Sequence, residues 1–510
     1  MVTVLILLAA VGILVWGFIR ARPDGKLGIF AWLQTVVLMV PWLAFFGLFT
    51  FGIYLNLAWI LTLVLISTGL YIYLGRQLRT LAAAAPPRQK LANTEADIDT
   101  GATDTTDSSS SPGAAIENST NATEGSTETA ASPVEPPAIP PAIPADDLAD
   151  IETIFGVDTF FRTETVPYQA GVFFRGNLRS EPDACLKALT AQLENRFNDR
   201  YRLFLINGPE DKPAVIVLPS KTDPKPADTK QKVLAVALAI ATLITSLETG
   251  ALLKDFSLFE QPGRWSEVLP TAIAILAILA VHELGHRWQA RRYQIKLSPP
   301  YALPAWQIGA FGALTRFESL LPSRTVLFDI SFAGPAAGGL LSLAMLIVGL
   351  LLSHPGSLYQ LPVEFFQESI LVGTLTRAVL GDTLQTVDLV DVDPLVLMGW
   401  LGLVITALNV MPAGRLDGGR VVQAIYGRKI AGRATAVTFV LLTIVALANP
   451  LALYWAALIL FLQRGDERPC LNDISEPDDA RAALALLLLF LMLATLLPLS
   501  PSLAGRLGIG

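Results

Sequence analysis

The sequence has few charged residues for its length. Only 16% of the 510 residues are Asp, Glu, Lys or Arg, whereas 52% are hydrophobic and the mean hydropathy is +0.52. A soluble globular chain carries about 25% charged residues, so the composition excludes an ordinary soluble enzyme. Cysteine is also scarce, since Cys185 and Cys470 lie far apart and form no CxxC pair. This excludes a disulfide scaffold and predicts two free thiols on a reducing face.

Basic residues are missing from one segment. Residues 91–150 hold twelve acidic side chains and no Lys or Arg, so the rest of the chain carries +5 although the whole chain carries −7. That remainder has no basic stripe dense enough to follow a phosphate backbone, and we expect no nucleic-acid partner. Residues 82–145 also have few large apolar side chains, so we predict a disordered acidic linker rich in Pro, Ser and Thr there.

Long apolar runs occupy much of the remaining sequence. A membrane-spanning helix needs about 20 mostly apolar residues, and such runs occur at 2–19, 29–49, 54–75, 232–253, 269–286, 326–352, 393–412 and 481–499. Asn449 and Pro450 interrupt a further stretch at 434–463, which leaves a kinked span or a short hairpin as alternatives. These runs predict a polytopic α-helical membrane protein with about eight to ten spans.

We expect four regions along the chain: three spans in 1–81, the linker at 82–145, a small α+β domain at 146–226, and a membrane domain with C-terminal spans at 227–510. Within the small domain, residues 181–198 have helical periodicity, and strand character occurs at 172–175, 201–206 and 214–218. The first run lacks a basic region before it and a clear cleavage site, which favours a retained span over a secretory signal.

The loops predict an orientation. Clusters of Lys and Arg follow the first, third, fifth and seventh runs, at 20–26, 76–90, 287–296 and 415–433. With the N-terminus outside, every one of these clusters falls on the cytosolic side, as the positive-inside rule requires. The linker and the small domain are then expected in the cytosol.

Histidine is also scarce, with three residues in the chain. His282 and His286 share one helix face at positions i and i+4, so they can hold one metal ion, and Glu283 can reach a water on that metal. The motif closes the apolar run Ala272–Val281. Ionisable residues at membrane depth are costly and usually functional; the alternative is a helix end whose polar residues reach the interface.

A catalytic zinc ion normally has three protein ligands and one open position. The remaining histidine, His354, is expected on the opposite face of the membrane, so the third ligand should be a carboxylate. Asp417 follows a sequence broken by Pro and Gly at the cytosolic end of its span, the depth at which His282 and His286 end theirs. Alone, Asp417 indicates a helix-terminating turn; together with the histidines it indicates a metal ligand.

The two motifs together resemble the site-2 protease family of intramembrane zinc metalloproteases. The likeness covers roughly residues 232–463 and is carried by HELGH at 282–286 and by Asn409-x-x-Pro412-x-x-x-Leu416-Asp417-Gly418. It implies that His282, His286 and Asp417 bind one zinc ion per chain and that Glu283 activates water. It also implicates Asn409 in the active site, with Pro412, Leu416 and Gly418 as supporting motif residues.

Two shorter segments extend the resemblance. Residues 176–179 read GNLR and are similar to a signature of the chloroplast and cyanobacterial branch, and without a transit peptide we expect a cyanobacterial member. Residues 332–338 are similar to a small-residue segment of the family's middle core helix, which we interpret as close helix packing. No PDZ-like domain is evident, so the resemblance does not explain how substrates are selected.

The resemblance implies hydrolysis of peptide bonds in or near transmembrane segments of membrane-protein substrates within the lipid bilayer. Two other classes stay open: a membrane metal transporter that uses the same ligands, and a proteolytically inactive scaffold. Few ionisable residues in the core spans argue against the transporter, and an intact set of site residues argues against the scaffold. Pro and Gly residues interrupt the stretch at 301–318, so it cannot form a membrane-spanning helix. We expect it at the membrane surface as a strand that holds the substrate, and the alternative is an ordinary cytosolic loop.

The expected location is therefore a bacterial plasma membrane or a thylakoid membrane, with several passes through the bilayer and the active site near the cytosolic side.

Overall fold

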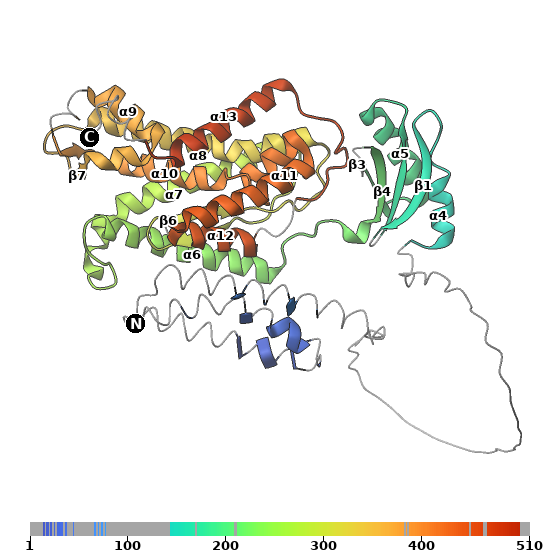
Figure 1. Ribbon diagram of the computed structural model, residues 1–510, viewed down its shortest axis with the longest axis horizontal. Helices are drawn as coiled ribbons and strands as arrows, with labels where there is room; N and C mark the ends of the chain where they lie inside the picture. The colour runs from blue at the N-terminus through green and yellow to red at the C-terminus, as the bar shows by residue number, and fades with distance from the viewer. Residues whose placement is uncertain are drawn as a thin grey trace, which may run out of the picture. The chain divides into compact units, whose positions relative to one another are not determined.

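The computed structural model (Figure 1) describes residues 143–499 except 169–170, 209–211, 382–383, 385–386, 448–449 and 463–466, together with scattered residues between 14 and 77. The chain divides into two compact units, Met1–Ser132 and Pro133–Gly510. The three spans expected in 1–81 and nearly all of the linker expected at 82–145 lie outside the described residues. The following description therefore concerns the second unit.

A four-stranded antiparallel sheet forms the first part of this unit. Its order is β1-β2-β4-β3, with β1 at Phe160–Tyr168, β2 at Gly171–Leu178, β3 at Tyr201–Asn207 and β4 at Pro213–Pro219. Two helices, α4 (Ala145–Glu152) and α5 (Pro182–Phe197), accompany the sheet. The predicted helix and three strands are present, whereas β1 and α4 were not predicted. β1 has few buried side chains and contains Pro167, so its sequence lacks the apolar alternation of a strand.

Both cysteines are buried and free, as the sequence predicted. Cys185 belongs to the core between α5 and the sheet, and Cys470 lies in the chain segment that precedes the last helix. Burial raises the pKa of each thiol, since a thiolate loses its hydration there. Both are therefore inert packing residues.

Four helices in the described part of the chain are long and apolar enough to cross a membrane. They are α6 (Thr229–Leu252), α7 (Trp265–Arg292), α8 (Arg324–Leu352) and α13 (Asp479–Leu496). Each one matches a predicted span within a few residues. Together with the sheet domain they confirm a polytopic helical membrane protein with a small α+β domain.

Two predicted spans have a different form in the structure. The run at 393–412 gives the 16-residue helix α10 (Pro394–Asn409), which ends before the run does because Pro412 has no N–H group to continue the helix. The stretch at 434–463 is broken at the Asn-Pro pair, so α11 (Asp417–Val445) and α12 (Pro450–Leu462) are separate helices that pack together. This confirms the hairpin alternative. Inside α11, Gly427 has a φ of 80° and produces a kink.

Small residues allow the central helices to approach closely, and α8 packs on both α7 and α10 (Figure 1). A side chain at Gly285 of α7 would clash with the backbone of Ala333, and one at Gly399 of α10 would clash with the backbone of Leu346. Close packing through small residues is a common way for membrane helices to associate. It brings α7, with its two histidines, against the small-residue segment of α8.

A β-hairpin of β5 (Tyr301–Ala305) and β6 (Gly309–Leu314) lies along α6. Arg316 bonds to Gln231 near the start of α6, and the Thr249 hydroxyl donates to the carbonyl of Trp306 near its end. Those contacts span about 27 Å at 1.5 Å per helical residue, so the expectation of a position at the membrane surface is wrong. Non-helical backbone at membrane depth must be satisfied by protein, and hydroxyls on α6 do so, as Thr245 donates to the carbonyl of Gly309.

A short segment at 467–475 ties the two parts of this unit together. Leu471 and Asn472 donate their backbone N–H groups to Leu321 and Pro322 ahead of α8. The same segment pairs with Leu205 of β3. The sheet domain is thus hydrogen-bonded to the chain that carries the membrane helices. A two-stranded antiparallel sheet of β7 (Tyr359–Pro362) and β8 (Leu389–Val392), with α9 (Ile370–Leu380) between the two strands in the sequence, completes the described fold.

Candidate metal centre

Three buried side chains from α7 and α11 meet at one point. His282 Nε2 lies 3.1 Å from Asp417 Oδ2, His286 Nε2 lies 3.3 Å from the same oxygen, and the two Nε2 atoms are 3.2 Å apart. Zinc bonds of about 2.0–2.1 Å in tetrahedral geometry would separate the donor atoms by roughly 3.3 Å. The three donors therefore fit one face of a zinc tetrahedron and leave the fourth position open.

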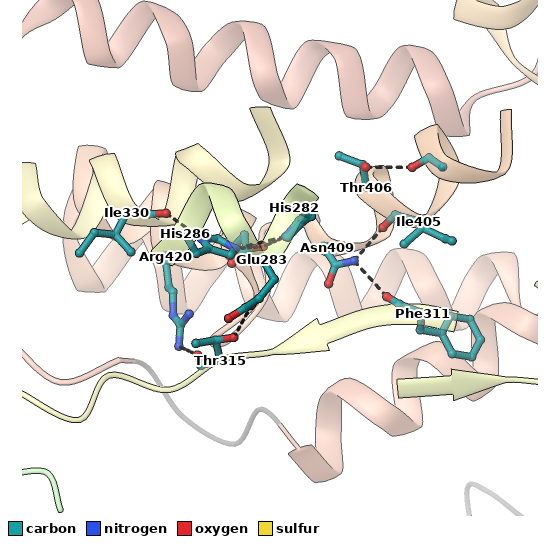
Figure 2. Close-up of polar contacts among 12 residues, drawn as sticks. His282, Glu283, His286, Phe311, Thr315, Ile330, Ile405, Thr406, Asn409 and Arg420 are labelled. Carbon is teal, nitrogen blue, oxygen red and sulfur yellow. Dashed lines mark hydrogen bonds and ion pairs between the residues drawn. The ribbon is translucent and has the colours of Figure 1, made fainter. Parts of the chain in front are cut away.

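The orientation of the His286 ring is fixed by the backbone. Its Nδ1 donates to the carbonyl of Ile330 on α8 at 2.7 Å (Figure 2). This bond keeps the proton on Nδ1, so the lone pair of Nε2 remains available to a metal. Any side chain at Gly334 would clash with the His286 ring, and one at Gly338 would press on His282 at 3.0 Å. The small-residue segment thus packs closely, as expected, and the surface it packs on is the histidine pair.

Glu283 lies beside the metal ligands and is held from two directions. The Thr315 hydroxyl donates to its Oε2 at 2.8 Å, and Figure 2 shows the two side chains pointing toward one another. Arg287, one turn further along α7, forms an ion pair with Oε1 at 2.8 Å. Only 8% of the glutamate surface is exposed. A carboxylate so placed can accept a proton and keep its position while doing so.

The contact that supports Thr315 was not predicted from the sequence. Arg420, three residues after Asp417, donates to the carbonyl of Thr315 at 2.8 Å (Figure 2). Glu467 forms an ion pair with Arg420 at 2.9 Å. Glu467, Arg420, Thr315 and Glu283 therefore form one continuous chain of contacts. In the sequence, the one feature that pointed to this chain of contacts was an arginine three residues after Asp417. An arginine at that spacing does not by itself indicate a role in the site.

Asn409 contacts β6 rather than the metal ligands. Its amide donates to the carbonyls of Phe311 and Ile405, at 3.0 and 2.8 Å, and the side chain is 2% exposed (Figure 2). Gly312, with a φ of 113°, leaves room for this amide, because a side chain there would clash with it. Asn409 therefore fixes the position of β6 next to Glu283.

The remaining motif residues shape the loop before Asp417. The carbonyl of Pro412 accepts from Thr438 at 3.3 Å, and Leu416 is buried at the N-terminal end of α11. A side chain at Gly418 would clash with the backbone of Val410. The loop is thus folded tightly against the end of α10, and this contact sets where Asp417 points.

Comparison with known proteins places the chain in a family. Residues 270–449 match the model of peptidase family M50, and residues 149–226 match the EGY3 middle domain. "Probable zinc metalloprotease EGY1, chloroplastic" of Arabidopsis thaliana is 37% identical over 404 residues, which are 71% of this chain and 74% of that protein. The chain belongs to peptidase family M50.

Other M50 relatives match over a smaller share of their length. "Probable zinc metalloprotease EGY2, chloroplastic" of Oryza sativa subsp. indica is 39% identical over 353 residues, which are 68% of this chain and 65% of the relative. "Probable zinc metallopeptidase EGY3, chloroplastic" of Arabidopsis thaliana is 33% identical over 377 residues, 69% of this chain and 65% of the relative. The chain thus spans slightly less than two thirds of these two proteins. No solved structure matches.

These M50 relatives confirm the resemblance to site-2 proteases. All three are named as chloroplast proteins, so they give no support to the cyanobacterial source expected from the sequence. The GNLR interpretation of residues 176–179 stays a prediction. In the structure, Gly176 packs against Phe160 of β1, whereas Asn177 and Arg179 are exposed.

Proposed function

We propose that this chain is a zinc metalloprotease that hydrolyses peptide bonds in or near the transmembrane segments of membrane-protein substrates. The observation that carries the proposal is the set of three donor atoms 3.1–3.3 Å apart, with Glu283 next to them on a helix long enough to span a membrane. The names of the relatives and the M50 match support the same activity.

Each residue has one role in this proposal. His282, His286 and Asp417 hold one zinc ion per chain, whose chemistry when bound is to lower the pKa of water and to polarise a carbonyl group. Glu283 accepts the proton of the attacking water and passes it to the leaving amine. Thr315 and Arg287 hold Glu283 in place. Asn409 acts through β6, and Pro412, Leu416 and Gly418 position the loop that carries Asp417.

The substrate must present an extended peptide to these groups. A helical peptide bond is shielded by its own hydrogen bonds, so a transmembrane substrate has to unwind locally before cleavage. We propose that the unwound segment lies beside β6 as an added strand. Support comes from Thr315, which directly follows β6 and contacts Glu283, and from Asn409, which anchors the strand.

The orientation and the regions stay as proposed from the sequence. The active site faces the cytosolic side of a plasma or thylakoid membrane, because the basic clusters at 287–296 and 415–433 include the C-terminal end of α7 and the first part of α11, the helix ends that carry the ligands. The regions are three spans in 1–81, a linker at 82–145, the sheet domain at 146–226 and the protease domain at 227–510, except that the sheet domain already includes Ile143 and the first residue of α4, Ala145. A cyanobacterial source would be consistent with a location in either the plasma membrane or the thylakoid membrane.

One substitution tests the proposal and separates it from its alternatives. Glu283→Gln preserves shape but cannot accept a proton, so zinc content should persist while peptide hydrolysis falls by about 10²–10⁴-fold. Zinc analysis and cleavage of a single-span reporter, with purified wild-type and variant proteins, give both readouts. A transporter would keep metal flux in the variant, and an inactive scaffold would show no cleavage in either protein. Full cleavage by an uncontaminated Glu283→Gln preparation would overturn the mechanism.

A further inference from the structure

A charged cavity lies next to the metal centre and takes no part in the mechanism above. It has a volume of about 250 Å³ and is bordered by the chain before α6, the chain between β6 and α8, the loop before Asp417, and residues 467–469. We call it the cationic pocket, and its charged residues are Lys225, Arg316, Arg415, Arg468, Glu318 and Glu467.

The four basic and two acidic side chains give the lining a net charge of +2. Both acids are already engaged, because Glu467 forms its ion pair with Arg420 and Glu318 accepts the backbone N–H of Ala227 at 2.7 Å. Arg316, by contrast, donates to the neutral oxygens of Gln231 and Tyr301, which do not cancel its charge. The pocket therefore favours an anionic ligand.

Two residues of the pocket lie close along the chain to the catalytic groups. Arg316 directly follows Thr315, the residue that contacts Glu283, and Arg415 comes two residues before Asp417. The ring of Phe317 forms part of the wall, and the guanidinium of Arg420 lies 4.7 Å from its centre. Since an extended chain advances about 3.3 Å per residue, a peptide bound at Glu283 would reach the pocket within a few residues.

We propose that the cationic pocket binds Asp or Glu side chains of the substrate, in the segment that flanks the cleaved bond on the cytosolic side. This inference rests on the proposed protease function and adds a rule for substrate selection. Both polar and apolar groups line the pocket, with Phe317, Leu320 and Pro469 among the latter, which suits a carboxylate on an aliphatic stem. Its position within a few residues of Glu283 favours a substrate peptide over a lipid headgroup.

Such a pocket would reject most membrane proteins. Transmembrane segments usually carry Lys and Arg on their cytosolic flank, and a pocket of charge +2 repels those side chains while it attracts carboxylates. Selection by repulsion of the wrong partner is a common route to specificity. The pocket would in this way select substrates within the protease domain itself.

The test uses three reporter substrates that differ only in their cytosolic flank, which carries two Glu, two Gln or two Lys residues. We expect the purified full-length protein, in vesicles of zwitterionic phosphatidylcholine, to cleave the Glu reporter with a kcat/KM about tenfold above that for the Lys reporter. Lys225→Glu with Arg468→Glu should reverse this order. Arg291→Glu makes a similar charge change on the exposed end of α7, outside the pocket, and should leave the order unchanged.

The result is the ratio of kcat/KM for the Glu reporter to that for the Lys reporter, measured on one preparation. A partial loss of folded protein lowers both rates equally and leaves this ratio unchanged. If the double variant is inactive, the single variant Lys225→Gln should still bring the ratio closer to one. Equal cleavage of all three reporters by the wild type would overturn the pocket proposal and leave the protease function intact, whereas no cleavage of any reporter would count against the function itself. Equal cleavage that rises with phosphatidylglycerol content, and loses this rise in Lys225→Gln, would assign the pocket to a lipid headgroup instead.

Discussion

His282 and His286 lie on one uninterrupted helix, α7, whereas Asp417 is the first residue of α11 and follows a tight loop. On α7, the spacing of four residues alone turns both rings to one face, with ring centres 4.9 Å apart. On α11, the position of Asp417 depends on contacts with other parts of the chain, such as Gly418 against Val410 and Arg420 against Glu467. Local geometry places two of the ligands on one helix face, where the carbonyl of Ile330 then orients the His286 ring, whereas tertiary contacts set the position of the third ligand itself.

The comparison has a consequence for mutagenesis. The histidine pair can be disabled only by changing the histidines or the helix surface that touches them. The aspartate, by contrast, can be displaced from a distance, through a backbone clash or through a side chain about 50 residues away such as Glu467. The predictions below probe each side in turn.

The largest effect is expected from removal of the α7 ligands. His282→Ala with His286→Ala leaves Asp417 as the only donor of the set, so zinc should fall from about one ion per chain to almost none, and cleavage should cease. Metal analysis of the purified variant gives the result. His354→Ala removes the third histidine, which is exposed and lies after α8, and should keep both zinc and activity. If the double variant still bound one zinc ion per chain, the assignment of His282 and His286 as zinc ligands would be wrong.

The next effect is expected from the backbone beside Asp417. Gly418→Ala places a methyl group against the carbonyl of Val410, so the start of α11 has to shift. We expect a loss of about 1–3 kcal/mol in the free energy of unfolding, as for other overpacked sites, and weaker zinc binding. Thermal unfolding and a chelator titration measure the two quantities. Gly432→Ala, further along α11 where an added methyl group meets nothing, is the matched control and should be neutral or slightly stabilising.

The contrast between local geometry and tertiary contacts also explains which features of the structure could be predicted from the sequence. The long spans α6, α7 and α8 follow from local hydropathy, and the convergence of His282, His286 and Asp417 followed from loop charge combined with the two motifs. Helix α10 is shorter than its apolar run because Pro412 has no N–H group to continue it, which is a local effect. The bond from Asn409 to the carbonyl of Phe311 in β6 belongs instead to the tertiary structure.

Features that depend on distant contacts were missed. Hairpin β5–β6 lies along α6 because Thr245 and Thr249 satisfy its carbonyls, and no pattern within residues 301–318 indicates such partners. Thr315 and Arg420 were missed as site residues for the same reason, since each gains its role only from the other and from Glu283. Residues 467–475 have no regular secondary structure, yet they join β3 to the chain before α8.

An intermediate effect is expected from the chain of contacts that runs from α11 to Glu283. Thr315→Val removes the hydroxyl that holds the carboxylate but keeps the shape of the side chain, so kcat should fall by about tenfold, the value of one lost hydrogen bond to a charged group. KM and zinc content should change little, because the valine touches neither the metal ligands nor the cationic pocket. Thr443→Val is the control, as that hydroxyl bonds only to the carbonyl of Phe439 in its own helix. A parallel loss of zinc in Thr315→Val would show a structural role instead.

The smallest effect is expected from a change that touches neither α7 nor α11. Residues 82–145 were predicted to form a disordered linker because their composition offers little apolar surface to bury, and we therefore expect them to be dispensable for hydrolysis. In the structure, however, Ile143 is fully buried in the core of the sheet domain and α4 begins at Ala145. A deletion should therefore stop at residue 132, the boundary between the two compact units. Removal of residues 91–132 should leave cleavage of the Glu reporter within about twofold of the wild-type rate, since surface changes away from packed features have little energetic effect. Zinc content and the rate are measured on the same preparation. A loss of either would mean that this acidic segment is needed by the site and is not dispensable.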